Sequence, residues 1–376
     1  MKIVHLLPHF ANDGNGVVYV ATDLACAQSS AGHAVTCIGA RGGSLELLLQ
    51  GRAVVTHVIP EFGLHLVHSL LGLWRRLKTL RPQLVHAHTV PTALIAKLLQ
   101  PFFGYSLVTS VHNGPRLKNY LLAVGDRIIC VSAAVAQGIK LPSSGRKVRI
   151  VRNGPLGSPR RTEHDSPPAA VDVNGPTIVT MAGLHPHKGV RDLIEAFAIA
   201  RKTIPDLSLY ILGKGPEQAE LQSLADRLAC SDHVRFEGFV SDPRAYLSRA
   251  DLFVLPSHSE AFGLSIAEAR EAGCAVVGTN VGGIPEVLED GRSGILVPAR
   301  DPVALGRVLV ELFSDRSLLT LWRSRASSNL SWLRVDRVLA ETMAVYDELL
   351  RSKPGYASRG RDEIATLADQ RSSGCG

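Results

Sequence analysis

Short apolar runs alternate with longer amphipathic stretches along most of the chain. Apolar runs of about four to eight residues predict buried strands, and the stretches between them have helical length and periodicity. We expect strands at 1–8, 34–39, 54–59, 84–88, 106–111, 127–132, 148–151, 177–181, 207–213, 234–240, 251–255 and 274–278. We expect helices at 17–31, 64–80, 190–202, 217–228, 265–272, 302–314 and 331–350. Strands that alternate with helices indicate an α/β protein with parallel sheets, whose ligands bind at the carboxyl ends of the strands.

One polar segment divides this pattern into two halves. Residues 157–176 (GSPRRTEHDSPPAAVDVNGP) are rich in proline, serine and charge, which is typical of a linker between domains. We therefore expect a first domain at 1–160, a linker at 161–176 and a second domain at 177–330. A helical segment at 331–352 follows. The polar residues 353–376 are expected to be disordered.

Composition supports a globular protein with two domains. The chain has 376 residues, of which 45% are hydrophobic and 20% charged. Its six cysteines lack the spacing of a metal site or a disulfide framework, which suits a reducing compartment. The opening residues, MKIVHLLPHF, fit a first strand better than a signal peptide, and no apolar run approaches membrane-spanning length. We expect a cytoplasmic protein.

Charge is concentrated in the first half. Residues 1–156 carry a net charge of +11 and residues 157–376 a net charge of −4. A basic domain indicates an anionic partner, and the absence of a nucleic-acid-binding motif favours a phosphorylated substrate or an anionic membrane surface. Residues 64–80 form a basic amphipathic helix, whose apolar stripe we expect to pack mainly on the sheet. Weak, salt-sensitive membrane contact through this domain is the corresponding prediction.

The densest candidate chemistry lies in residues 251–301. Glu260 and Glu268 are separated by seven residues and flank Phe262-Gly263-Leu264. A glycine before a helix lets backbone N–H groups approach an anion. Two simpler interpretations stay open. Glu260 can be a solvated loop charge, and Glu268 can cap its own helix, because Ser265-Ile-Ala-Glu268 fits a capping box.

Three further strand ends carry polar groups. Gly14-Asn15-Gly16 follows the first strand and suits a phosphate-binding turn, although it lacks the dinucleotide fingerprint. Lys188-Gly189 places a cation at a strand-to-helix turn, where it can meet a diphosphate. His86, His88 and His112 stand at or beside strand ends, where an imidazole can exchange hydrogen bonds with a ligand or be satisfied locally.

Residues 251–301 closely resemble the donor-site region of glycosyltransferase family 4. The shared pattern is PS-x-x-E-x-F-G-L-x-x-x-E-A, then V-G-G-I-P-E, then D-G-x-x-G-x-L-V-P. The resemblance covers roughly residues 1–350, is strongest at 177–301 and is diffuse in the first half. It implies an α/β GT-B fold, with two Rossmann-like domains facing across a cleft and the last helix crossing back onto the first domain.

The resemblance also implies roles for single residues. Lys188 would stabilise the leaving diphosphate, and Glu260 and His112 would hold the donor sugar. Glu268 would bind the ribose. The other implied donor-binding residues are Gly14, Asn15, Gly16, Phe236, Gly238, Phe262, Gly263 and Leu264, and the implied acceptor-side residues are His86 and His88. The chain departs from the family pattern at Gly183, where the family has arginine.

The predicted function is that of a retaining glycosyltransferase. It would move a sugar from a nucleotide-diphosphate sugar to a hydroxyl of a saccharide or lipid-linked acceptor, in cell-surface polysaccharide or glycolipid synthesis at the inner membrane face. No cofactor is expected, and no metal, because no D-x-D motif stands at a donor loop. A nucleotide-sugar epimerase and a binding module without turnover are the alternatives, and a redox Rossmann enzyme is a more distant one.

Overall fold

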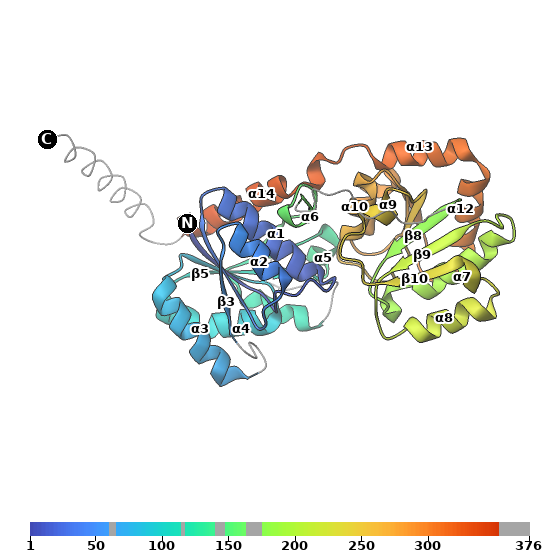
Figure 1. Cartoon of the computed structure of the whole chain (residues 1–376). Helices are drawn as coiled ribbons and strands as arrows, with labels where there is room; N and C mark the ends of the chain where they lie inside the picture. Colours follow the sequence, from blue (N-terminus) through green and yellow to red (C-terminus); the bar gives the residue numbers. More distant parts are fainter. Residues whose placement is uncertain (60–64, 114–116, 140–146, 163–174, 353–376) are drawn as a thin grey trace.

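The computed structural model describes residues 1–59, 65–113, 117–139, 147–162 and 175–352. They form two parallel sheets covered by helices, side by side along the long axis of the molecule (Figure 1). This confirms the predicted α/β class. The segment at 163–174 and the tail at 353–376, for which we predicted a linker and disorder, lie outside the described residues.

The first sheet has seven parallel strands in the order β3-β2-β1-β4-β5-β6-β7. Apolar, β-branched runs form its strands, which are mostly buried except at the two edges of the sheet. These are β1 (Lys2–Leu6), β2 (Ala34–Gly39), β3 (Val55–Val58), β4 (Leu84–Ala87), β5 (Ser106–Val111), β6 (Arg127–Cys130) and β7 (Val148–Ile150). The helices around it are α1 (Gly16–Ser30), α2 (Ser44–Gly51), α3 (Leu66–Leu80), α4 (Val90–Phe103) and α5 (Ala133–Gln137).

The second sheet has six parallel strands in the order β10-β9-β8-β11-β12-β13. The strands are β8 (Thr177–Met181), β9 (Ser208–Leu212), β10 (Val234–Gly238), β11 (Leu252–Leu255), β12 (Ala275–Thr279) and β13 (Ile295–Val297). The helices are α7 (Val190–Arg201), α8 (Gln218–Arg227), α9 (Arg244–Leu247), α10 (Leu264–Glu271), α11 (Ile284–Val287), α12 (Pro302–Ser314) and α13 (Arg316–Ala326). Seven of the elements of the two domains were not among those that the sequence pattern predicted, namely α2, α4, α5, α9, α11, α13 and β13.

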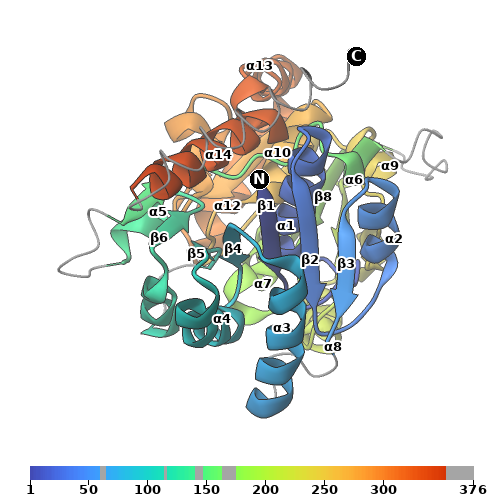
Figure 2. The same cartoon turned by 90° about the vertical axis from the view of Figure 1, so that its left-hand side faces the viewer.

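The last described helix, α14 (Val335–Arg351), returns to the first domain, as the family resemblance implied. Both views show it lying along the first sheet and its helices (Figures 1 and 2). Its apolar face is buried through Val338, Val345, Tyr346 and Leu349, in one cluster with residues of β1, β4, β5 and β6. The chain therefore crosses between the two domains twice. The two crossings run side by side at Leu156, whose N–H donates to the Leu333 carbonyl over 3.1 Å.

The basic helix α3 is only partly buried. Leu73 and Leu77 are fully buried against the sheet, as predicted, whereas Val67 is 65% exposed and Leu71 53% exposed. The apolar stripe is wider than the sheet can cover, so its outer half faces solvent. Among the described residues, no helix combines the length and hydropathy needed to cross a membrane.

Candidate functional site

Lys188 and Glu260 meet in the second domain. Lys188 ends a short 3₁₀ turn, η3 (Pro186–Lys188), after β8, and Glu260 lies in the loop after β11. The Lys188 Nζ atom is 2.6 Å from Glu260 Oε2, and the two side chains are 23% and 15% exposed. Because β8 and β11 are neighbours in the sheet, their following loops lie together. The structure thus brings together two of the predicted site residues.

Close backbone contacts hold these loops in place. A Cβ atom at Gly189, where φ is +65°, would lie 2.0 Å from the carbonyl oxygen of Pro256. A Cβ atom at Gly282, where φ is +54°, would lie 1.8 Å from the Glu260 carbonyl oxygen. Both positions therefore require glycine. The Glu260 loop is clamped from two sides, which fixes the carboxylate beside Lys188.

Helix α10 begins two residues earlier than the capping-box interpretation requires. Its N-cap is Gly263, with φ of +101° and no side-chain hydrogen bond, so Ser265 lies inside the first turn. The predicted alternative in which Ser265 and Glu268 form a capping box is therefore wrong. Glu268 lies farther along the helix, and its carboxylate is available for other partners.

The partners of Glu268 come from the beginning of the linker. The short helix α6 (Pro159–Thr162) carries Arg160 and Arg161. Arg161 Nη1 is 3.0 Å from Glu268 Oε1 and also pairs with Glu271, whereas Arg160 Nη2 is 3.7 Å from Glu268. Sequence reasoning treated these two arginines only as linker charge. Their adjacency to an acidic helix face can be seen only in the fold.

Arg160 also ties this cluster to the first domain. It lies 4.1 Å above the Tyr19 ring, and its Nε atom is 3.4 Å from Asp23 Oδ1, both in α1. Burial raises the pKa of Asp23, and the positive charge of Arg160 partly offsets that effect. Helix α6 therefore connects α1 of one domain to α10 of the other.

The predicted glycine loop of the first domain faces the second domain. A Cβ atom at Gly14, where φ is +85°, would contact the Phe239 ring at 3.4 Å, and one at Gly16 would contact Leu264 Cδ1 at 3.2 Å. Between them, the Asn15 side chain accepts a hydrogen bond from the N–H of Val17 and caps α1. The loop after β1 thus lies against the loops that follow β10 and β11 in the second domain.

The two phenylalanines predicted to bind the donor, Phe262 and Phe236, pack mainly on the core. Phe262 is 2% exposed and packs edge-on against Trp332, so its side chain supports the loop and is closed to a ligand. Phe236 packs partly buried on the core of the second domain. Gly238 has φ of +72°, and its Cβ position is 3.1 Å from Lys214 Cε. The space above Gly238 is therefore bordered by a lysine stem.

At position 183, where the family has arginine, a histidine ring lies beside the glycine. A Cβ atom at Gly183 would lie 3.3 Å from Cδ2 of His185. Lys214 is on the neighbouring loop after β9, and its carbonyl accepts a hydrogen bond from the N–H of Leu184 over 3.0 Å. His185 and Lys214 are therefore the basic side chains on the segments that meet at Gly183.

Two of the predicted histidines, His88 and His112, form one hydrogen-bonded group with His5. His112 Nε2 lies 3.1 Å from His88 Nδ1, and His88 Nε2 lies 3.0 Å from His5 Nδ1. His5, which sequence reasoning passed over, is fully buried in β1. Burial lowers the pKa of His5 to about 4 and that of His112 to about 4, so the group is neutral near pH 7.

His86 differs from its predicted acceptor-side placement. It is 1% exposed, and both ring nitrogens have protein partners, Tyr346 Oη of α14 at 2.6 Å and Ser110 Oγ at 2.7 Å. The crossing helix covers it, so His86 cannot contact an acceptor. His88 is 3% exposed and is likewise enclosed. Within the described part of the chain, only His5, His86 and His88 are grouped closely enough to be considered as metal ligands.

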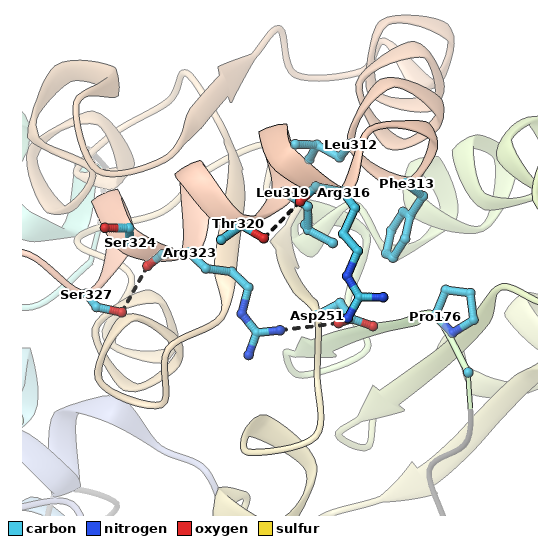
Figure 3. A pocket seen from close by; sticks show the side chains of 11 residues that line it. Pro176, Asp251, Leu312, Phe313, Arg316, Leu319, Thr320, Arg323, Ser324 and Ser327 are labelled. Carbon is cyan, nitrogen blue, oxygen red and sulfur yellow. Dashed lines mark hydrogen bonds and ion pairs between the residues drawn. The ribbon is translucent and has the colours of Figure 1, made fainter.

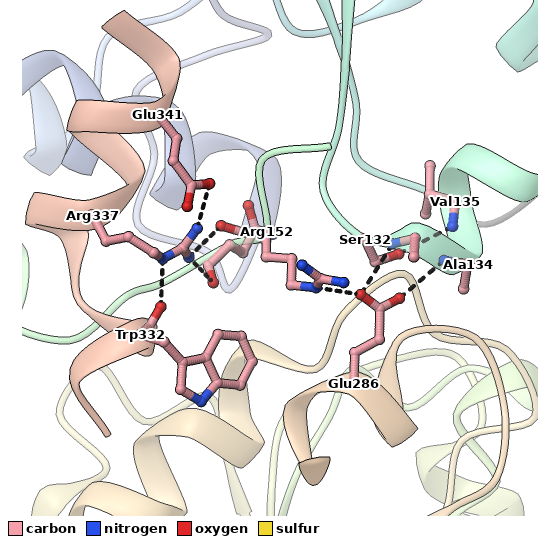
Figure 4. Close-up of polar contacts among 10 residues, drawn as sticks. Ser132, Ala134, Val135, Arg152, Glu286, Trp332, Arg337 and Glu341 are labelled. Carbon is pink, nitrogen blue, oxygen red and sulfur yellow. Dashed lines mark hydrogen bonds and ion pairs between the residues drawn. The ribbon is translucent and has the colours of Figure 1, made fainter. Parts of the chain in front are cut away.

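A second interdomain contact involves Glu286 of the V-G-G-I-P-E segment. Its carboxylate accepts hydrogen bonds from the N–H groups of Ala133 and Ala134, at the start of α5, over 3.0 and 2.9 Å. Arg152 Nε also donates to it over 2.7 Å (Figure 4). The carboxylate thus satisfies the exposed N–H groups of a helix N-terminus in the other domain.

One cavity lies away from these residues. It has a volume of about 770 Å³ and is bordered by Pro176, Asp251 and residues of α12 and α13, with Arg323 Nη1 3.3 Å from Asp251 Oδ1 (Figure 3). Pro176 and Asp251 precede β8 and β11, so this cavity is at the amino edge of the sheet. A second cavity of about 250 Å³ is bordered by Arg161, Arg244, Glu268 and the 241–243 loop. Among the predicted site residues, Glu268 borders this second cavity.

Two family models and several known proteins match this chain in sequence. The family model described as "Glycosyltransferase Family 4" matches residues 14–154, and the model described as "Glycosyl transferases group 1" matches residues 162–328. The lipopolysaccharide core biosynthesis glycosyltransferase LpsE of Rhizobium meliloti is 27% identical over 363 residues, covering 94% of this chain and all of that protein. A D-inositol 3-phosphate glycosyltransferase of Streptomyces scabiei is 28% identical over 329 residues, covering 78% of this chain and 74% of that protein.

Solved structures share the whole architecture. Anabaena HepE, in complex with UDP-glucose, superposes with a TM-score of 0.76 at 19% identity, covering 93% of this chain and 99% of that chain. WaaG, a glycosyltransferase involved in lipopolysaccharide biosynthesis, superposes with a TM-score of 0.71 at 15% identity, covering 91% and 98%. With the two family models spanning both domains, the chain belongs to glycosyltransferase family 4, is a glycosyltransferase and has the GT-B fold.

Proposed function

We propose that this glycosyltransferase takes its sugar from a nucleoside-diphosphate sugar and transfers it, with retention of anomeric configuration, to a hydroxyl acceptor. The observation that carries this proposal is the pairing of Lys188 with Glu260 at 2.6 Å, at the carboxyl edge of the second sheet. An ammonium group has three N–H donors, so Lys188 can keep one on Glu260 and offer the others to a leaving phosphate. A positioned cation stabilises charge as the bond to the leaving group breaks.

The first domain would complete the diphosphate site. The loop at Gly14 and Gly16 lies against Phe239 and Leu264, so its backbone borders the same space from the opposite side. Asn15 caps α1 at this point, and a helix N-terminus favours an anion. Lys214 and His185 are our candidates for the second cation that Gly183 does not supply.

Glu268 is proposed to hold the ribose of the donor. Its carboxylate borders the 250 Å³ cavity and has Arg161 as an ion-pair partner. A ribose that bound there would displace or share this arginine, and its two hydroxyls would donate to the carboxylate. Glu260 and His112 would hold hydroxyls of the sugar, which positions the anomeric carbon for attack.

Retention is proposed on the basis of the family pattern. The departing phosphate would accept the acceptor proton on the face from which it leaves, so no protein base is required on the opposite face. We expect no metal or cofactor in this reaction. The names of LpsE and WaaG include lipopolysaccharide synthesis, which supports a saccharide or lipid-linked acceptor in a cell-surface pathway.

The outer faces of α3 and α4 are proposed to contact an anionic lipid surface at the cytoplasmic face of the membrane. Exposed apolar side chains gather there beside exposed cations, and we call this group the α3–α4 patch: Val67, Leu71, Trp74, Leu98, Phe102, Arg75, Arg76 and Lys78. Trp74 packs edge-on against Phe102 with ring centroids 5.2 Å apart. Exposed apolar side chains beside basic side chains favour binding to the interface of an anionic bilayer.

A thermal-shift screen tests the donor assignment. UDP, GDP and their hexose conjugates would be added singly, because a ligand that binds only the native state raises the melting temperature. We expect one nucleoside diphosphate and at least one of its sugars to stabilise the protein. Stabilisation by none of them would contradict the proposed donor class.

A further inference from the structure

A continuous line of hydrogen bonds runs from helix α1 to the histidine that follows β5. Gln28 Oε1 is 2.7 Å from His5 Nε2, and His5 Nδ1 is 3.0 Å from His88 Nε2. His88 Nδ1 is in turn 3.1 Å from His112 Nε2. Gln28, His5 and His88 are all buried, so solvent does not compete for these bonds.

The orientation of the Gln28 amide determines which nitrogen of each histidine in the line carries the proton. The Gln28 amide nitrogen faces Met343 Sδ at 3.8 Å, which leaves its carbonyl oxygen toward His5. A carbonyl only accepts, so His5 must carry its proton on Nε2. A neutral imidazole has one N–H group, and His5 Nδ1 is then an acceptor. By the same rule His88 is protonated on Nε2, and so is His112.

The last nitrogen of the line is left without a partner. His112 Nδ1 is buried and has no hydrogen-bond partner within the described part of the chain. Burial lowers the pKa of all three histidines, so none gains a second proton that would reverse the direction. A buried, unpaired acceptor costs free energy unless a ligand satisfies it.

His112 lies at the edge of the sheet that faces the second domain. Gly14, after β1, borders Phe239, and Ala133, after β6, donates to Glu286. In the sheet, β4 and β5 stand between β1 and β6. Because all of these strands are parallel, His112, which directly follows β5, lies between the two interdomain contacts.

We propose that Gln28, His5 and His88 are positioning residues that hold His112 in the tautomer protonated on Nε2, so that Nδ1 accepts a hydrogen bond from a hydroxyl of the donor sugar. This inference rests on the proposed function for the identity of the ligand. It makes the enzyme selective for donors that carry a hydroxyl at the matching carbon. Through Gln28, α1 would contribute to recognition of the sugar, while its N-terminus borders the glycine loop.

A metal ion bound by His5, His86 and His88 would require the opposite arrangement. Their ligand atoms lie within 4.8 Å of one another. A metal on His88 Nε2 would leave the proton of His88 on Nδ1, which would donate to His112 Nε2 and place the proton of His112 on Nδ1. The two arrangements therefore predict different tautomers of the same ring.

Long-range proton–nitrogen NMR correlations of protein labelled with ¹⁵N-histidine distinguish them, with His112→Asn used to assign the signals. We expect His112 to carry its proton on Nε2 in the wild type and in Gln28→Glu, which keeps an acceptor oxygen. Gln28→Leu should give a mixture of tautomers. A proton on His112 Nδ1 in the wild type, or no change in folded Gln28→Leu, would overturn the proposal, as would stoichiometric zinc binding that shifts the signals of the three clustered histidines.

Binding measurements give an independent readout. Calorimetry would compare UDP-glucose with UDP, and GDP-mannose with GDP. We expect Gln28→Leu to weaken binding of the preferred sugar conjugate about five- to tenfold, as for one lost hydrogen bond, and to spare the bare diphosphate. Equal weakening of both would contradict the positioning role. A wild-type protein that binds none of these compounds would contradict the proposed donor class, whereas the NMR spectra would still decide the tautomer.

Discussion

Lys188 Nζ and Glu260 Oε2 lie 2.6 Å apart although 72 residues separate them in the chain. Parallel pairing of β8 with β11 brings their loops together, and glycines at 189 and 282 permit the close backbone contacts. The cation that would meet the leaving group and the carboxylate that would meet the sugar are therefore one unit. Loss of either should change turnover more than folding.

Replacement of Lys188 by alanine should lower kcat about a hundredfold or more, because the leaving phosphate loses its positioned cation. Steady-state transfer from the donor found in the thermal-shift screen measures this. Arg191→Ala is the matched control, since Arg191 pairs with the exposed Glu220 nearby on the same domain. Normal turnover in Lys188→Ala, with the control also normal, would rule out the assigned role.

Glu268→Gln should weaken donor binding by about 1.5–3 kcal/mol, the usual contribution of a hydrogen bond to a charged group. The melting temperature should fall only modestly, through loss of the ion pair with Arg161, because Gly263 and not Glu268 caps α10. Glu271→Gln serves as the control, since Glu271 also pairs with Arg161 but is 40% exposed. If titration calorimetry gave equal effects for the two variants, the ribose assignment would be wrong.

Acidification should destabilise the first domain through its buried histidines. Burial lowers the pKa of His5 and His112 to about 4 in the native protein, while the unfolded chain titrates near 6.5. Between these values the unfolded state binds more protons, so the free energy of unfolding falls as pH falls. Each such histidine contributes roughly 1.4 kcal/mol per pH unit.

Urea denaturation at several pH values from 7.5 to about 5 tests this. We expect His88→Gln to give a shallower pH dependence than the wild type, because burial also lowers the pKa of His88 in the native state. An identical slope in the variant and the wild type would mean that other groups dominate the acid response.

The α3–α4 patch should bind anionic vesicles weakly and in a salt-sensitive manner. Trp74→Ser should reduce co-sedimentation with phosphatidylglycerol vesicles at low salt, because the exposed indole and its contact with Phe102 would be lost. Leu321→Ser, which changes a comparably exposed residue in α13 of the second domain, should have no effect. Equal failure of the wild type to bind anionic and neutral vesicles would favour a soluble acceptor.

The sequence pattern predicted the α/β class and most strands, because buried strands in a parallel sheet are short continuous apolar runs. It missed β13, which has only three residues, and α13, most of whose residues are polar. It could not predict that Phe262 turns into the core or that α14 covers His86. Those outcomes depend on which loops and helices meet across the two domains. The pairing of Arg161 with Glu268 also could not be predicted, because it depends on how the start of the linker packs against α10.

Retaining transfer breaks the bond between the donor sugar and its diphosphate and forms the new bond on the same face of the anomeric carbon. Incubation of the enzyme with the donor selected by the thermal-shift screen, with water as the acceptor, can be followed by proton NMR from the first minutes. We expect nucleoside diphosphate together with the unchanged sugar, released first in the anomeric configuration of the donor and about a hundredfold more slowly with Lys188→Ala. Initial release of the opposite anomer would contradict retention, and release of an epimerised sugar would contradict simple sugar transfer.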